Sequence, residues 1–260
     1  MDDADIRLRA GDLDGARSAL VENVRSNPSD PGARLFLFQL LALAGDWEKA
    51  RNHLNTLAKL SPEAQMLSVV YNQALDAEAQ RAEVFAGKAK AAVLRGAWAE
   101  GIATALQHYA QGDAEAGDAA RDEALEQAPD TPGEMDGARF DWIADSDSRF
   151  GPTFEAVMHG RYGLIAFSEV ERIESEGPKD LRDLVWYPVQ IHFKEGQSVA
   201  ALLPARYPGT EASDDTAERM GRSTSWKASD SGEIGSGQHL LALSSGEERG
   251  LLSLRSLTFD

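Results

Sequence analysis

The sequence contains no cysteine among its 260 residues. Disulfide frameworks and thiolate zinc sites are therefore excluded, and a reducing compartment such as the cytoplasm is favoured. The first twelve residues, MDDADIRLRAGD, are acidic and lack an apolar stretch, so we expect no secretory signal peptide. The longest apolar stretch, from Leu35 to Ala44, is too short to span a bilayer. We therefore expect a cytoplasmic protein that does not enter a membrane.

Basic residues are also scarce, with 26 Lys and Arg against 43 Asp and Glu, which gives a formal charge of −17. Binding to nucleic acid or to an anionic membrane needs a basic surface, so we expect neither partner. A protein partner with basic residues would be attracted. The alternative, that the acidity only keeps the protein soluble, stays open.

Residue patterns that carry catalysis are missing. None of the five histidines has another histidine three or four positions later, and neither H-E-x-x-H nor G-x-S-x-G occurs. The sequence therefore predicts no cofactor, no metal centre and no enzyme.

A 34-residue repeat is present in the first part of the chain. It is marked by five pairs of identical residues: Gly11 and Gly45, Asp12 and Asp46, Ala16 and Ala50, Leu20 and Leu54, and Pro28 and Pro62. This period is typical of the tetratricopeptide repeat, a pair of antiparallel helices. The glycines suit left-handed turns, the aspartates suit helix N-caps, and the small alanines allow close helix packing.

A weaker third copy runs from Gly112 to Pro129, and residues 63–94 read as a long alanine-rich helical stretch. We therefore expect six or seven helices within residues 3–128, stacked as a short solenoid, and we assign residues 1–128 to a tetratricopeptide-like domain. Leu35, Gln39 and Leu43 fall on the first helix of the second unit, near the expected concave face. They predict either a groove for an amphipathic helix or ordinary core packing between helices.

The pattern changes after Pro129, and residues 129–260 predict a mostly antiparallel α+β domain. The expected strands are Arg139–Ala144, Arg161–Phe167, Tyr187–Phe193, Ser198–Leu203, Ser223–Ala228, His239–Leu243 and Leu251–Leu257. Two short helices are expected at Pro152–His159 and at Ser213–Met220. The predicted fold class is therefore α+β, with a helical solenoid followed by this second domain.

The stretch FDWIADSDSRFG is the part of the sequence that most resembles a metal-binding or catalytic site, because Asp141, Asp145 and Asp147 are close in sequence. A calcium loop starting at Asp145 fails, since Arg149 and Ala156 stand where ligands are needed. An arginine among aspartates favours internal ion pairing, but a hydrolytic or metal-dependent site near Asp145, Asp147 and Arg149 remains an alternative hypothesis.

Two further stretches, DLRDLVWYP and ARYPG, also place Arg and Asp beside aromatic residues. Such residues occur at protein interfaces and in buried hydrogen-bonded networks, and the sequence does not show in which of these two settings they lie.

The order WIADSDSR, GRY, DLRDLVW and RYPG behind a degenerate tetratricopeptide region resembles the ImpE/SciE family. The matching positions are Trp142, Asp145, Asp147, Arg149, Arg161, Tyr162, Asp180, Arg182, Asp183, Trp186, Arg206 and Tyr207. The resemblance implies a cytoplasmic accessory protein of the bacterial type VI secretion system. It further implies a partner, the N-terminal helix of the small contractile-sheath subunit TssB, and an effect on sheath assembly or on recycling by the unfoldase ClpV.

Taken with the residues, the resemblance favours a non-enzymatic adaptor with the partner-binding candidates just named, together with Leu35, Gln39 and Leu43. A tetratricopeptide adaptor unrelated to secretion is a further alternative.

Overall fold

The computed structural model describes residues 2–229 and 232–260. The α-helices are α1 (Asp2–Arg9), α2 (Leu13–Ser26), α3 (Pro31–Leu43), α4 (Trp47–Leu60), α5 (Glu63–Phe85), α6 (Glu100–Ala110), α7 (Ala114–Gln127) and α8 (Thr216–Arg219). Short 3₁₀ helices are η1 (Ala97–Ala99), η2 (Phe167–Glu169), η3 (Leu181–Leu184), η4 (Thr210–Ala212) and η5 (Leu251–Ser253).

The strands of the first half of the sheet region are β1 (Val93–Arg95), β2 (Gly133–Met135), β3 (Ala138–Phe140), β4 (Ile143–Asp145), β5 (Thr153–Met158), β6 (Arg161–Ala166) and β7 (Val170–Glu174). They are followed by β8 (Trp186–Phe193), β9 (Ser198–Pro204), β10 (Thr224–Ser229), β11 (Gly232–Gly237), β12 (Leu240–Leu243), β13 (Glu248–Gly250) and β14 (Ser256–Phe259).

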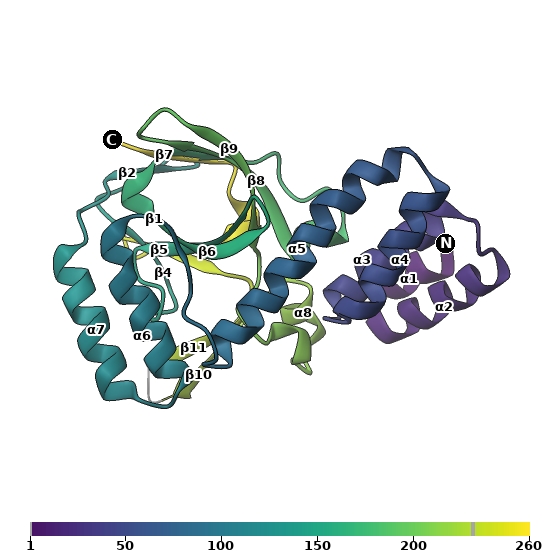
Figure 1. The fold of residues 1–260 in the computed structure, drawn as a ribbon, viewed down its shortest axis with the longest axis horizontal. Coiled ribbons are helices and arrows are strands. Elements are labelled where there is room, and N and C mark those ends of the chain that lie inside the picture. The colour runs from purple at the N-terminus through teal and green to yellow at the C-terminus, as the bar shows by residue number, and fades with distance from the viewer. Residues whose placement is uncertain (1, 230–231) are drawn as a thin grey trace.

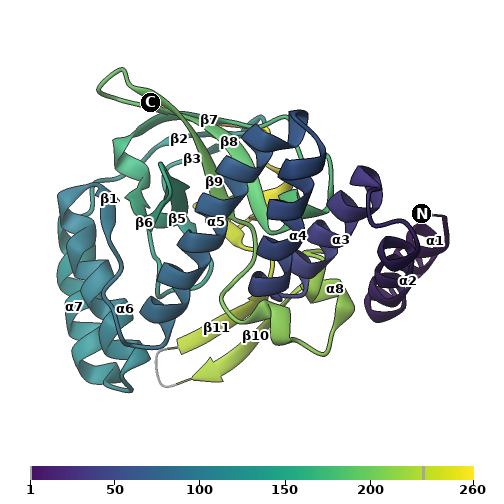
Figure 2. The same ribbon diagram turned by 45° about the vertical axis from the view of Figure 1, so that its right-hand side comes forward.

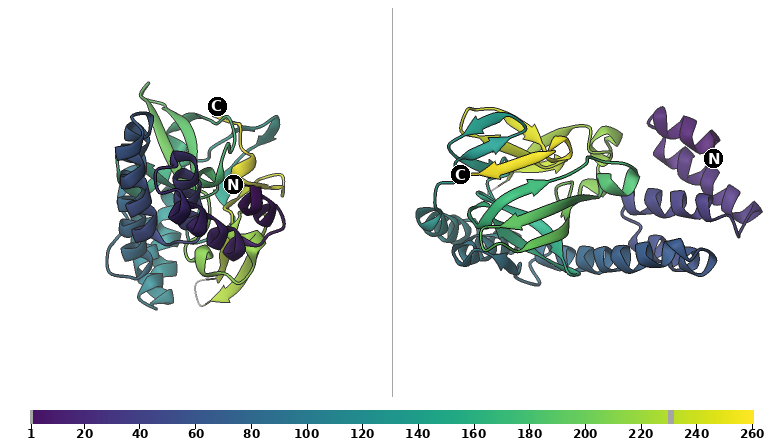
Figure 3. Two further views of the ribbon diagram at one scale, coloured as in Figure 1. Left: turned by 90° about the vertical axis from the view of Figure 1, so that its right-hand side faces the viewer. Right: turned by 90° about the horizontal axis from the view of Figure 1, so that it is seen from above.

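The helical repeats and the sheet lie at opposite ends of the molecule, and α5 runs from one to the other (Figure 1). Seen from above, α1 to α4 extend away from the body that contains the sheet (Figure 3). The N-terminus lies on the helical arm and the C-terminus on the sheet side (Figure 1). The expected α+β class, with tetratricopeptide-like helices followed by a mostly antiparallel sheet, is confirmed.

The repeat residues have the predicted roles, except that the Asp46 side chain makes no N-cap hydrogen bond. Gly11 and Gly45 have φ values of 82° and 72°, in the left-handed region that favours glycine. Asp12 caps α2 by accepting a hydrogen bond from the Gly15 amide at 2.8 Å. Asp46 holds the corresponding position before α4, but its carboxylate pairs with Lys49 at 2.6 Å instead of a backbone amide. The small and leucine positions of both copies, Ala16, Leu20, Ala50 and Leu54, are fully buried.

The third copy forms a helix pair but does not extend the stack, contrary to our expectation. The chain passes through strand β1 before α6, and β1 pairs in parallel with β6 in the large sheet. The apolar side chains of α6 and α7 pack with those of the second half of α5 and of the sheet region, among them Ile102, Ala124, Phe150 and Leu164. A solenoid of five helices, α1 to α5, is therefore followed by a helix pair that covers the sheet (Figure 1).

The main sheet has nine strands in the order β1-β6-β5-β9-β8-β7-β14-β2-β3, and all its neighbours except β1 and β6 pair antiparallel. A three-stranded sheet, β13-β12-β4, and the hairpin β10–β11 complete the region. The hairpin lies beside α8 at the bottom of the molecule (Figure 2).

The helix predicted at Pro152–His159 is wrong, because Thr153–Met158 form strand β5, which pairs with β6 and β9. All six residues of β5 are buried, and a continuous apolar run has no period that separates a buried strand from a helix. His159 and Gly160 form the two-residue hairpin turn between β5 and β6, in which φ is 53° at His159 and 74° at Gly160.

Two predicted strands are also corrected. Arg139–Ala144 divides into β3 of the large sheet and β4 of the small one, because the chain bends at Asp141 and Trp142. Leu251–Leu257 begins with η5, and only its end belongs to β14. The helix expected at Ser213–Met220 exists as α8, but its cap is Asp215, whose carboxylate accepts from the Ala217 amide at 2.7 Å.

Candidate functional site: a buried ionic network and an apolar groove

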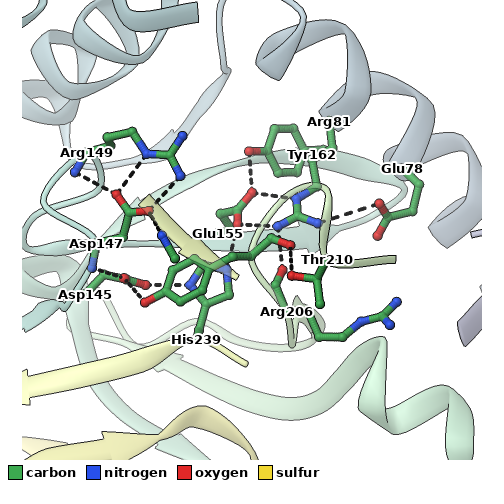
Figure 4. A network of polar contacts seen from close by, with 12 residues as sticks. Glu78, Arg81, Asp145, Asp147, Arg149, Glu155, Tyr162, Arg206, Thr210 and His239 are labelled. Atoms are coloured by element: carbon green, nitrogen blue, oxygen red, sulfur yellow. Dashed lines mark hydrogen bonds and ion pairs between the residues drawn. The ribbon is translucent and has the colours of Figure 1, made fainter. Parts of the chain in front are cut away.

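Eight charged or titratable side chains are buried where α5 meets the sheet, and we call them the buried network. They are Glu78, Arg81, Asp145, Asp147, Arg149, Glu155, Arg206 and His239. Figure 4 shows Glu155 near the centre, between Arg81 and His239. Four carboxylates and four cationic groups meet there when the histidine is protonated, so the network balances its own charge, as buried ions must.

Strand alternation places Glu155 in this position. Successive side chains of a strand face opposite sides, and Phe154, Ala156 and Met158 face the core of the sheet. Glu155 and Val157 therefore face α5. There Arg81 donates two hydrogen bonds of 2.7 Å to the two Glu155 oxygens, a bidentate pair.

Several neighbours complete the environment of Glu155. The Tyr162 hydroxyl donates to Glu155 Oε1 at 2.6 Å. Arg81 also donates to the carbonyl of Arg206 at 2.8 Å and lies 3.8 Å from Glu78, one turn earlier on α5. Burial by itself would raise the pKa of Glu155, but the charge of Arg81 and the contacts with Arg81 and His239 hold that pKa well below its usual range.

His239 lies between two carboxylates. Its Nδ1 is 2.6 Å from Asp145 Oδ2, and its Nε2 is 2.9 Å from Glu155 Oε2, the second contact being an ion pair without hydrogen-bond geometry. Burial lowers the pKa of His239, but Asp145 and Glu155 outweigh this effect and raise it to about 9. Burial also raises the pKa of Asp145, so the two groups compete for one proton, and Glu155 favours the imidazolium.

Asp145 and Asp147 are held by hydrogen bonds rather than left open toward a ligand. Asp145 accepts from the Tyr207 hydroxyl at 2.7 Å and from the Asp147 amide at 2.8 Å. Asp147 pairs with the Arg149 guanidinium at 2.9 and 2.6 Å and accepts from the Gly235 amide at 3.1 Å. The arginine among the aspartates therefore forms the internal ion pair that the sequence favours.

Arg206 connects the two ends of the molecule. Its Nη1 donates to the carbonyls of Leu43 at 3.0 Å and of Arg219 at 2.6 Å, the last residues of α3 and α8. A cation is favourable there because the carbonyls at helix C-termini carry partial negative charge. Burial lowers the pKa of Arg206 to about 10, which leaves it charged at neutral pH.

A small cavity borders the buried network on the side of Glu78 and Arg206. The cavity bordered by Glu78, Arg81, Arg206 and Tyr207 measures about 10 Å³, space for one water molecule. Within the described residues, no three His, Asp or Glu side chains form a group suited to a metal ion. The arrangement therefore ties α3, α5 and α8 to the sheet, and it offers no open nucleophile or ligand set.

The segment from Pro178 to Leu184, which we call the strap, crosses from the sheet region to the solenoid. Asp180 and Asp183 form a reciprocal cap that starts η3. The Arg182 guanidinium lies 4.9 Å from the centre of the Tyr71 ring of α5 and pairs with Asp180 at 2.8 Å. Trp186, fully buried after the strap, donates its indole N–H to Glu78 at 2.9 Å.

An apolar groove of about 540 Å³ lies between α1, α3 and the strap. Its walls are Leu8, Leu35, Phe36, Leu181 and Leu184, with Asp5, Gln39, Lys179 and Asp180 among the polar lining. The predicted candidates Leu35, Gln39 and Asp180 thus meet at one surface. Leu43 is fully buried and does not reach it.

The other candidates lie apart from the groove. Trp142, 47% exposed, and Arg161 are on the surface. Arg182 is half-buried beside Tyr71. The remaining candidates are interior side chains: Asp145, Asp147, Arg149, Tyr162, Asp183, Trp186, Arg206 and Tyr207.

Sequence reasoning missed Glu78, Arg81 and Glu155 and treated His239 as an isolated histidine. One signal was present for Glu155, a single charge inside the apolar run TFEAVM. Its partners come from α5 and from the segment before β12, 74 to 84 positions away, and no local pattern joins them.

Comparisons with known proteins agree with this architecture. Residues 137–258 match the family described as ImpE protein, and residues 7–70 match the tetratricopeptide repeat. The X-ray crystal structure of protein VPA1032 from Vibrio parahaemolyticus has the same fold, with a TM-score of 0.86 at 23% identity, over 99% of this chain and 97% of that one.

A curated relative extends the likeness along the sequence. The type VI secretion system accessory component TagJ of Pseudomonas aeruginosa is 44% identical over 256 residues, which cover 97% of this chain and 89% of TagJ. From this match and the ImpE match across the sheet region, we conclude that the chain belongs to the ImpE protein family.

Proposed function

We propose that this protein is a non-enzymatic, cytoplasmic accessory component of a type VI secretion system that binds the N-terminal helix of the small sheath subunit TssB. The secretion role follows from the 44% identity with TagJ across 97% of the chain. The same match weighs against a tetratricopeptide adaptor unrelated to secretion.

The observation that carries the binding role is the apolar groove. Five aliphatic or aromatic side chains from α1, α3 and the strap line it, and a tetratricopeptide-like region supplies two of its walls. A partner's amphipathic helix places apolar residues on one face at intervals of three and four, which matches such a surface. Asp5 at the groove and the formal charge of −17 favour a basic residue beside that apolar face.

The expected affinity is modest. Burying three or four apolar side chains contributes about 5–12 kcal/mol at about 1.5–3 kcal/mol each. Ordering a flexible segment costs about 2–5 kcal/mol, and association itself costs more. The balance corresponds to a Kd of about micromolar or weaker. Many sheath subunits in one assembly raise the avidity, which suits a factor that influences sheath assembly or ClpV-linked recycling.

The enzyme hypothesis has little support in the buried network. Asp145 and Asp147 are hydrogen-bonded to side chains and backbone amides, and the cavity beside Arg81 and Tyr207 admits one water molecule. Catalysis needs a cleft in which a reacting atom lies within hydrogen-bond reach of the catalytic groups. Binding without turnover therefore fits these residues best.

Isothermal titration calorimetry with a synthetic TssB N-terminal peptide tests the proposal. We expect saturable binding to the full chain, weakened about tenfold or more in Leu8→Ser and Leu35→Ser, since each change removes an apolar contact worth about one decade of affinity.

The matched control is Leu125→Ser, because Leu125 is a 39% exposed leucine on α7, outside the groove. It should bind the peptide as the unmodified chain does. Absence of heat at high micromolar peptide, or equal binding by the groove variants, would reject the proposal.

A further inference from the structure

Exposed apolar side chains are concentrated at one place on the helical arm. Among the described residues, seven large hydrophobic side chains are exposed: Ile6, Leu60, Met66, Val69, Val70, Leu125 and Trp142. Leu60 ends α4, and Met66, Val69 and Val70 lie on the first two turns of α5. Their exposed fractions on α5 are 72%, 56% and 39%, and their spacing of three and four puts them on one helix face. Single exposed apolar residues need no explanation, but a cluster does.

The repeat explains where this cluster lies. The α3 residues that line the apolar groove are Gly32, Leu35, Phe36 and Gln39, which we call the α3 row. Positions 34 residues later are Met66, Val69, Val70 and Gln73, which we call the α5 row.

Buried positions follow the same offset. Leu37 and Leu41 of α3 correspond to Tyr71 and Leu75 of α5, and all four side chains are buried. The α5 row is therefore the α3 row of the next repeat, and it faces outward from the solenoid at the equivalent position.

A segment of the chain itself, the strap, lies beside the α3 row. The strap lies against α3, and Leu181 and Leu184 line the same groove as Leu35 and Phe36 and pack against the same apolar core. These leucines are three positions apart on one helical turn, within the sequence DLRDL. The α5 row has no such covering, as its exposure shows.

We infer that the α5 row is a second docking surface, whose occupant is a Leu-x-x-Leu helical turn of a partner protein. Val69 and Val70 stand at the repeat positions of Leu35 and Phe36, and Met66 adds a flexible thioether where the α3 row has Gly32. The inference does not depend on the ligand of the groove or on the TssB assignment.

The strap supplies the probe. A lactam-stapled, fluorescein-labelled peptide with the sequence of residues 176–187 carries the Leu-x-x-Leu turn that lies against α3 in this chain. We expect a saturable rise in fluorescence anisotropy when the full chain is titrated up to 1 mM. A Val69→Ser/Val70→Ser variant should bind at least tenfold more weakly, while Leu125→Ser, a control with the exposure of Val70, should bind equally.

Methionine methyl NMR gives a second readout that does not depend on a substitution in the row. Met66 is exposed, whereas Met135, Met158 and Met220 are at most 7% exposed. In ¹³C-methyl-methionine protein, the resonance assigned to Met66 by its loss in Met66→Leu should shift as the peptide is added, and those of the three buried methionines should not.

Three results would overturn the inference. The first is no saturable binding at 1 mM with an unmoved Met66 resonance. In the second, binding is lost in Leu35→Ser but kept in Val69→Ser/Val70→Ser, which assigns the peptide to the groove. The third is self-association in sedimentation that the double variant abolishes, which assigns the α5 row to a second copy of this chain.

Discussion

The two ends of the molecule are held together by different forces. In the solenoid, the repeated positions Ala16, Leu20, Ala50 and Leu54 are fully buried and apolar, and the ion pairs Lys49–Asp46 and Arg51–Asp76 are on the surface. Beside the sheet, eight charged or titratable groups share the interior with apolar residues. Apolar contacts have no preferred direction, whereas a buried ion network is stable only in an arrangement that compensates its charges. The difference suggests a fixed body that carries an arm suited to binding.

Among the substitutions that test this difference between the two regions, Arg81→Met should have the largest effect on stability. It leaves Glu155 buried without its bidentate partner, and such a loss costs about 3–5 kcal/mol. Urea unfolding should show a decrease in the free energy of unfolding of this size. Arg81→Met/Glu155→Leu should recover much of the loss, because the network then again holds equal numbers of carboxylates and cations. A loss below about 1 kcal/mol in the single variant would mean that the network does not stabilise the fold.

The next effect is a pH dependence that His239 imposes. Its pKa is raised from an ordinary 6.5 to about 9 in the folded chain, so the folded state holds the proton more tightly than the unfolded state. The resulting stability is complete below about pH 6.5 and is lost as the pH rises through about 9, a change on the order of 3 kcal/mol. Unfolding free energies from pH 6 to 10 should fall in the unmodified chain and stay flatter in His239→Gln. Parallel curves for the two proteins would show that His239 is not the titrating group.

The smallest effect on stability is expected for a surface ion pair of the solenoid, which serves as the comparison for Arg81. Arg51 of α4 pairs with Asp76 of α5 at 2.7 Å, with side chains 35% and 62% exposed. Because solvent screens such pairs, Arg51→Met should lower the free energy of unfolding by at most about 1 kcal/mol. The same Arg-to-Met change is thus made on the surface of the solenoid and inside the network. Equal losses at Arg51 and Arg81 would remove the distinction between the two regions.

The two regions also differ in how much of their structure the sequence predicts. In the solenoid, Gly11, Gly45, Ala16 and Ala50 act locally, and the 34-residue period by itself predicts the paired helices. Near the sheet, Glu155 lies on a buried strand that periodicity cannot tell from a helix, and its partners Arg81 and His239 are 74 and 84 residues away. Contacts over such separations are set by topology.

The residues of the candidate site also differ in whether the sequence could predict their place. Leu35 and Gln39 are predicted from their place in the repeat, and they do line a groove. The strap that forms its other wall comes from residues 178–184, far from α3 in the sequence, and no local pattern pairs the two. Aromatic and charged residues such as Trp186 and Arg206 suit an interface and an interior equally well by type, and their burial is visible only in the structure.

Hydrogen–deuterium exchange on the full chain, with and without the TssB N-terminal peptide, tests the central claim most directly, because it locates the binding surface without any substitution. The account predicts slower exchange in α1, α3 and the strap, and unchanged exchange in β5 and around His239. Protection confined to residues 145–149, or no protection at saturating peptide, would contradict it.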